Sequence, residues 1–179
     1  MDRPDPRIFL VTGIPGAGKT TVSKALAERF DRGVHVEADA LQRMIVSGGE
    51  WPKPPAPSGE ELRQISLRYK HAALLARSFY EAGFTAVIDD VALGELLEEY
   101  RWHLKGIPSY LVVLAPLVEV VARRDAGRSK SVFDTWGYLD GVLRETMRDI
   151  GMWVETSDLT VEATVDEVLR RVPREGQFT

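Results

Sequence analysis

Residues 13–20 read Gly13-Ile14-Pro15-Gly16-Ala17-Gly18-Lys19-Thr20. They fit the pattern G-x-x-x-x-G-K-[ST], in which glycines let the backbone approach a phosphate and successive N–H groups converge on it at a helix N-terminus. Lys19 can reach the β- and γ-phosphates, and the hydroxyl of Thr20 can complete a magnesium shell. These eight residues and the following Thr21 therefore form the candidate binding site for a nucleoside triphosphate.

The segments on either side of this loop have the order that the pattern requires. Residues 7–12 are a short β-branched and aromatic run, as expected of a buried strand. After the loop, apolar residues recur at helical spacing at Val22, Ala25, Leu26 and Phe30. The succession of strand, glycine loop and helix argues against a chance match.

The composition is that of an ordinary globular protein. With 179 residues, 44% of them apolar, the chain is long enough to bury a core, and we expect one domain over residues 1–179. A net charge of −4 argues against broad nucleic-acid binding. The absence of cysteine excludes disulfides and thiolate sites. Because we also find neither a long apolar run nor a signal-peptide core, we expect a cytoplasmic protein with no membrane partner.

Acidic residues follow two of the expected strands. Residues 34–38 alternate as a strand and precede Asp39, while the apolar residues 84–88 precede Asp89 and Asp90. Open α/β sheets bind ligands at the carboxyl ends of their strands. Asp39 is therefore a candidate catalytic carboxylate, although it could also cap the next helix. One of Asp89 and Asp90, with Asp89 favoured, is a candidate magnesium-shell residue, the alternative being a strand-end turn.

Residues 47–59 form an irregular segment, because four prolines and three glycines exclude regular structure. We interpret it as a flap beside the site. Trp51 within it could stack on a substrate or pack the flap onto the body of the protein. A capping box of Ser58 and Glu61 predicts the start of a long helix that ends near Gly83.

The second half of the chain continues the alternation. Helices are predicted over residues 95–105 and 138–150 and after Thr160, and strands over residues 109–115 and 152–155. The basic segment after the fourth strand contains Arg124 and Arg128. In a lid over residues 124–136, these two arginines could neutralise charge on a transferred phosphoryl group, although exposed arginines are often only surface residues. Residues 173–179 are predicted to be a frayed tail.

Five strands alternating with helices predict an α/β fold with a doubly wound parallel sheet. With the residues above, the chain resembles the P-loop small-molecule kinases, a group that contains nucleotide, shikimate and gluconate kinases and zeta toxins. Within that group it looks most like the chloramphenicol phosphotransferase-like branch. The resemblance rests on residues 13–20, 36–41, 87–94 and 124–128, of which only the phosphate loop is specific alone.

The resemblance implies a P-loop NTPase fold with sheet order 2-3-1-4-5, the cofactors ATP and Mg²⁺, and a mobile lid that supplies arginines. It also implies an aspartate after the second strand that takes the proton from a substrate hydroxyl, which maps onto Asp39. Many of these kinases have an arginine three residues later that contacts the acceptor. Here that place is Gln42, and Arg43 follows it. The candidate acceptor contacts are Asp39, Arg43, Trp51 and Asp90.

The leading hypothesis is an ATP-dependent kinase that phosphorylates a hydroxyl of a small molecule. The resemblance suggests an antibiotic as one candidate for this small molecule. In this hypothesis Asp39 orients and deprotonates the hydroxyl. Charge on the transferred phosphoryl group is neutralised by Lys19, Arg124 and Arg128. Magnesium and its waters are held by Thr20 and Asp89. One alternative is a kinase of nucleotides or nucleic-acid ends. The other is a nucleotide-binding switch without a small-molecule acceptor.

Overall fold

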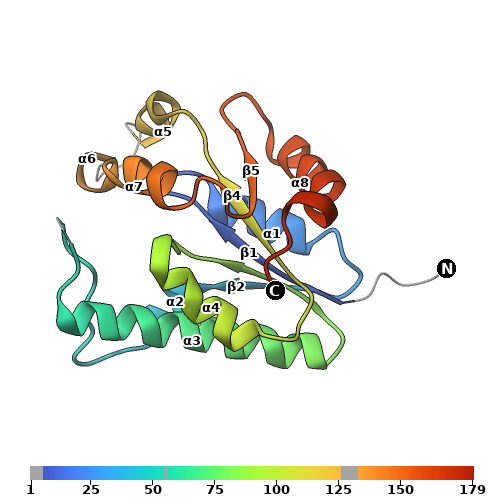
Figure 1. Ribbon diagram of the computed structural model, residues 1–179, viewed down its shortest axis with the longest axis horizontal. Coiled ribbons are helices and arrows are strands. Elements are labelled where there is room, and N and C mark those ends of the chain that lie inside the picture. Colours follow the sequence, from blue (N-terminus) through green and yellow to red (C-terminus); the bar gives the residue numbers. More distant parts are fainter. Residues whose placement is uncertain (1–5, 55, 126–132) are drawn as a thin grey trace.

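The computed structural model describes residues 6–54, 56–125 and 133–179. Within them, five strands form an all-parallel sheet in the order β2-β3-β1-β4-β5 (Figure 1). The strands are β1 (Ile8–Thr12), β2 (Gly33–Glu37), β3 (Thr85–Asp89), β4 (Ser109–Leu114) and β5 (Met152–Val154). Every residue of β1 and β3 is buried, as their continuous apolar sequences predict. The predicted fold class and strand order are confirmed.

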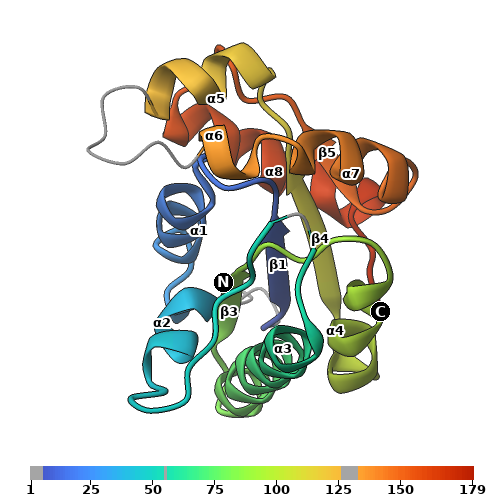
Figure 2. The same ribbon diagram turned by 90° about the vertical axis from the view of Figure 1, so that its left-hand side faces the viewer.

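Helices cover both faces of the sheet (Figures 1 and 2). The helix α1 (Lys19–Ala27) packs with α8 (Val161–Glu175), and α3 (Gly59–Glu81) packs with α4 (Leu97–Leu104). Shorter helices are α2 (Ala38–Arg43), η1 (Gly94–Leu96), α5 (Val118–Asp125), α6 (Phe133–Trp136) and α7 (Leu139–Thr146). No helix of the described residues is both long enough and apolar enough to span a lipid bilayer.

The carboxyl ends of three neighbouring strands meet at one edge of the sheet. Asp89, the last residue of β3, is in register with Val11 of β1 and Glu37 of β2. The phosphate loop, the start of α2 and Asp90 therefore lie at the same edge of the sheet. The second strand ends at Glu37, one residue earlier than expected, so Asp39 lies in the first turn of α2. The helix expected over residues 138–150 is shorter, since α7 ends at Thr146.

The end of the chain differs from the expected frayed tail. The helix α8 continues to Glu175, and the following residues run antiparallel to the start of β4, with a bridge between Tyr110 and Gln177. Phe178 is buried, and its N–H donates to the carbonyl of Ser109 at 2.9 Å. The physical reason is that β5 pairs only with Val112–Leu114 of β4, so the tail covers the remaining edge of that strand.

Candidate active site

The phosphate-binding loop connects β1 to α1 and has the backbone that its glycines permit. Gly13 has φ +149°, and a Cβ there would lie 2.5 Å from the carbonyl oxygen of Leu114. Gly16 has φ +87°, and its Cβ would lie 2.9 Å from the side chain of Val121. A side chain at either position would be both strained and obstructed. The fold therefore requires glycine at both of these positions of the loop.

A cavity of about 230 Å³ lies beside this loop. Its described lining consists of Pro15, Gly16, Lys19, Thr20, Asp39, Asp89, Asp90 and Val91. Burial lowers the pKa of Lys19, while the carboxylates of Asp89, Asp90 and Asp39 oppose this shift. The three carboxylates compensate the positive charge of the ammonium, which can also hold charged phosphate oxygens. We refer to this space as the phosphate cavity.

Both carboxylate oxygens of Asp89 have protein partners. The hydroxyl of Thr20 donates to Oδ2 at 2.7 Å, and Nε2 of His35 lies 2.8 Å from Oδ1. With the carboxylate of Asp89 as the acceptor, Nε2 of His35 is the donor of this hydrogen bond. His35 comes from the neighbouring strand β2, and its separation from Asp89 by 54 residues explains why the sequence did not reveal it.

Asp90 has a different environment, although it is the next residue along the chain. Its carboxylate receives hydrogen bonds from the hydroxyl of Tyr100 at 2.9 Å and from the N–H of Val91 at 2.8 Å. It also forms an ion pair with Arg68, whose Nη2 lies 2.9 Å from Oδ1. Burial raises the pKa of Asp90 above its usual value, and Arg68 and Tyr100 act in the opposite direction.

Arg68 is a second site residue that the sequence did not reveal. It lies on α3, and its side chain is only 5% exposed. Its Nη1 lies 3.7 Å from Oδ1 of Asp39, so the guanidinium connects Asp39 with Asp90. The available signal was its spacing, because Arg68 follows the buried Ile65 by three residues and precedes the buried Ala72 by four. An arginine on the buried stripe of a helix needs carboxylate partners.

Asp39 lies where the phosphate cavity adjoins a second cavity of about 310 Å³. Pro15, Asp39 and Val91 line both of them. The other described residues of the second cavity are Trp51, Pro52, Arg68, Trp136 and Leu139. The flap residue Trp51 thus lines a cavity beside the phosphate loop, and its role in contacting a substrate stays a prediction. We refer to this space as the acceptor cavity.

The remaining predicted site residues lie elsewhere. Arg43 forms an ion pair with Glu37 on the surface and is not among the described residues that line either cavity. Gln42 is buried and donates to the carbonyl of Glu50 at 3.0 Å, so it holds the flap instead of facing an acceptor. Arg128 and the side chain of Arg124 lie outside the described residues, and so does most of the predicted lid.

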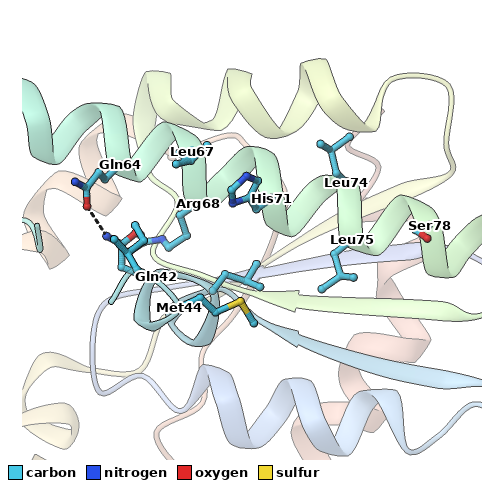
Figure 3. A pocket seen from close by; sticks show the side chains of 11 residues that line it. Gln42, Met44, Gln64, Leu67, Arg68, His71, Leu74, Leu75 and Ser78 are labelled. Atoms are coloured by element: carbon cyan, nitrogen blue, oxygen red, sulfur yellow. Dashed lines mark hydrogen bonds between the residues drawn. The ribbon is translucent and has the colours of Figure 1, made fainter. Parts of the chain in front are cut away.

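A larger groove of about 610 Å³ lies between α2 and α3 (Figure 3). Its lining is mostly apolar and includes Met44, Leu67, Leu74 and Leu75. Arg68 lines this groove as well as the acceptor cavity, and Figure 3 shows its side chain reaching from α3 toward α2. Near Arg68, the side chains of Gln42 and Gln64 form a hydrogen bond across the groove (Figure 3).

The flap is attached to α3 through Gln64. The side chain of Gln64 accepts from the N–H of Glu50 at 2.7 Å and donates to the carbonyl of Gly48 at 2.8 Å. We expect Gln64→Leu to lower the free energy of unfolding by about 1–3 kcal/mol, because these backbone groups lose their partner. Cleavage within the flap by proteinase K should become faster. Arg63→Gln is the control, since Arg63 is exposed and pairs with Glu60; equal cleavage of both variants would contradict this role of Gln64.

The oxygen donors beside Lys19 fit a magnesium ion bound together with a nucleotide. Mg²⁺ is usually held by one or two protein oxygens, several waters and substrate phosphates. The hydroxyl of Thr20 and the carboxylate of Asp89 lie together in the phosphate cavity and provide such oxygens. Among the described residues there is no cluster of three or more acidic, histidine or cysteine side chains that could hold a metal by itself. The oxygens of Thr20 and Asp89 thus suit a magnesium ion that also binds nucleotide phosphates and water.

Comparison with solved structures supports the fold. An APS kinase from Mycobacterium tuberculosis, in complex with AMPPNP and APS, has a TM-score of 0.70 at 15% identity, covering 93% of this chain and 97% of that one. A sugar kinase from Janibacter sp. HTCC2649 has a TM-score of 0.67 at 18% identity, covering 92% and 93%. A shikimate kinase from Acinetobacter baumannii, in complex with shikimate, has a TM-score of 0.62 at 20% identity, covering 94% and 93%.

Comparison at the level of sequence identifies the family. A UPF0200 protein from Aeropyrum pernix is 31% identical over 134 residues, which cover 72% of this chain and 71% of that protein. The AAA domain family matches residues 8–137. The resemblance to the chloramphenicol phosphotransferase-like branch stays a prediction. Because the family match extends from β1 through α6, the chain belongs to the AAA domain family and is a P-loop protein with the kinase type of fold.

Proposed function

We propose that this chain is an ATP-dependent phosphotransferase that transfers a phosphoryl group to a hydroxyl of a small molecule. The observation that carries the proposal is the position of Asp39, which lines both the phosphate cavity and the acceptor cavity. A carboxylate between these two spaces can contact an acceptor hydroxyl while that hydroxyl faces the terminal phosphate. The structural neighbours described as sugar, shikimate and APS kinases support the same class of reaction.

In the proposed reaction Asp39 orients the hydroxyl and accepts its proton. Arg68, at 3.7 Å from Asp39, holds the carboxylate in place. The N–H groups of the phosphate loop and the ammonium of Lys19 stabilise the charge that develops on the transferred group. Arg124 and Arg128 are proposed to add to this stabilisation from the lid. The flap, whose residues Trp51 and Pro52 line the acceptor cavity, keeps water from competing with the acceptor.

We further propose that Thr20 and Asp89 hold the magnesium ion and its waters. Bound with ATP, the ion would neutralise charge on the β- and γ-phosphates. Asp89 is preferred over Asp90 because its carboxylate is hydrogen-bonded to Thr20 of the phosphate loop, whereas the carboxylate of Asp90 is occupied by Arg68, Tyr100 and Val91. Asp90 then acts through Arg68 as a positioning residue.

The proposal is tested by a phosphotransfer screen with Mg–ATP against hydroxyl compounds. The panel contains antibiotics such as chloramphenicol, sugars, nucleosides and short 5′-hydroxyl oligonucleotides, and the mass of the product is measured. A phosphorylated small molecule is the expected result, whereas transfer to nucleosides or oligonucleotides alone would favour the alternative kinase. Hydrolysis of ATP with no phosphorylated product, whatever acceptor is added, would contradict the proposal and favour a switch.

His35→Ala should weaken magnesium binding. Without the hydrogen bond from Nε2, one oxygen of Asp89 loses its partner and the carboxylate is less well oriented. Loss of such a partner typically costs about 10- to 100-fold in metal affinity. We expect this decrease when Mn²⁺ is titrated into the protein with AMPPNP and followed by electron paramagnetic resonance. His71→Ala is the matched control, because His71 lines the groove between α2 and α3; equal affinities of the two variants would contradict the role of His35.

A further inference from the structure

The acceptor cavity offers few polar groups to a ligand. Among its eight described lining residues, six have apolar or aromatic side chains, and the two charged side chains are those of Asp39 and Arg68. The apolar members are Pro15, Trp51, Pro52, Val91, Trp136 and Leu139. They come from the phosphate loop, the flap, the end of β3 and the segment from α6 to α7. A ligand in this cavity is therefore surrounded mainly by hydrocarbon and indole surface.

Three of these lining residues, Pro15, Pro52 and Val91, have no free backbone N–H to offer a ligand. Pro15 and Pro52 have no N–H to donate. The N–H of Val91 donates to Oδ1 of Asp90 at 2.8 Å, and the carbonyl of Val91 accepts from the hydroxyl of Tyr69 at 2.6 Å. The peptide groups of Val91, which lines the cavity together with Asp39, are thus already used within the protein.

The charge of Arg68 is also already used. Its Nη2 and Nε lie 2.9 Å and 3.3 Å from the two oxygens of Asp90, and its Nη1 lies 3.7 Å from Asp39. A carboxylate or phosphate on an acceptor would have to compete with both aspartates for one guanidinium. It would also lie close to the negative charge of Asp39. The cavity is consequently poorly suited to an anionic acceptor.

We infer that the acceptor is an uncharged alcohol with a largely apolar, ring-bearing body, which contacts Trp51 and Trp136 while its hydroxyl lies at Asp39. A cavity of about 310 Å³ suits a small ligand of this kind. A sugar would leave several hydroxyls without partners, and each of these costs roughly tenfold in affinity. The inference rests on the proposed function: the alcohol oxygen bonds to the γ-phosphorus, the bond to the β,γ-bridging oxygen breaks, the proton goes to Asp39, and ADP leaves.

The inference is tested by binding measurements on the full chain saturated with Mg²⁺ and AMPPNP. The apolar probes are 3-phenylpropan-1-ol and cyclohexylmethanol, and the polar probes are D-glucose and D-gluconate, with dissociation constants determined by ligand-observed NMR. We expect the apolar alcohols to bind at least about tenfold more tightly than the polar probes. Trp51→Ala and Trp136→Ala should each weaken binding of the phenyl alcohol roughly 3- to 10-fold.

Trp102→Ala is the matched control, because Trp102 is 73% exposed on α4 and is not among the described residues of the acceptor cavity. Its affinities should equal those of the unmodified protein, and thermal unfolding checks that all three variants are folded. Equal or tighter binding of the sugars, no binding of either apolar alcohol, or unchanged affinity in both cavity variants would overturn the inference. Phosphorylation of a sugar that depends on Asp39 would overturn it while supporting the proposed function. Bound apolar alcohols without transfer to any acceptor would contradict the proposed function, and the cavity would then bind these alcohols as ligands and not as acceptors.

Discussion

Asp39→Asn should lower the rate of phosphoryl transfer by about 10²–10⁴-fold, the usual contribution of a positioned general base. Asparagine keeps the size of the side chain and its place in the first turn of α2, but it cannot accept the proton of the acceptor hydroxyl. It would still line both cavities. The loss should therefore appear in the rate of single-turnover transfer to an alcohol from the screen, measured at saturating Mg–ATP.

The affinity for Mg–ATP separates this loss from a general defect. Removing a negative charge beside the phosphate cavity should leave that affinity unchanged or raise it. Glu37→Gln is the matched control, because Glu37 lies two residues earlier, pairs with Arg43 on the surface and is not among the described lining residues. Transfer by Asp39→Asn at a rate close to that of Glu37→Gln would remove Asp39 from the proposed mechanism.

Arg68→Met should lower the free energy of unfolding at neutral pH by about 3–5 kcal/mol, the usual cost of removing one partner of a buried ion pair. Methionine replaces most of the volume of the arginine but leaves the carboxylate of Asp90 with the hydroxyl of Tyr100 and the N–H of Val91 only. Asp90 is only 3% exposed, so its carboxylate is poorly solvated once the guanidinium is removed. Denaturation by urea at pH 7 measures the difference.

The double variant Arg68→Met, Asp90→Asn should recover most of the lost stability, because a neutral amide needs no cation. A double variant no more stable than Arg68→Met alone would show that the loss comes from packing. The pH dependence gives a second check. Burial already raises the pKa of Asp90, and removal of Arg68 raises it further. A carboxyl whose pKa is raised in the folded state stabilises that state at a pH below its unfolded pKa, and this stabilisation is lost as the pH rises. The loss of unfolding free energy in Arg68→Met should therefore become smaller toward about pH 4.

The sequence alone determined the frame of the molecule. The loop between β1 and α1, the parallel sheet, and the start of α3 at the Ser58 and Glu61 capping box were predicted from residues close together in the chain. These features depend on local rules: glycines for a backbone with positive φ, apolar runs for buried strands, and side chains that satisfy the first turn of a helix. The order of the strands came from the resemblance to P-loop kinases, and the structure confirms it.

Only the tertiary structure decided how the side chains at the site divide their roles. Asp89 and Asp90 are adjacent in sequence, yet successive residues face different neighbours: the first contacts Thr20 and His35, and the second contacts Arg68. These partners are 22 to 69 residues away, and no local pattern reports such contacts. The same holds for the tail, whose place depends on the short pairing between β4 and β5. Local chemistry therefore determined where the site begins, and long-range packing determined which groups share it.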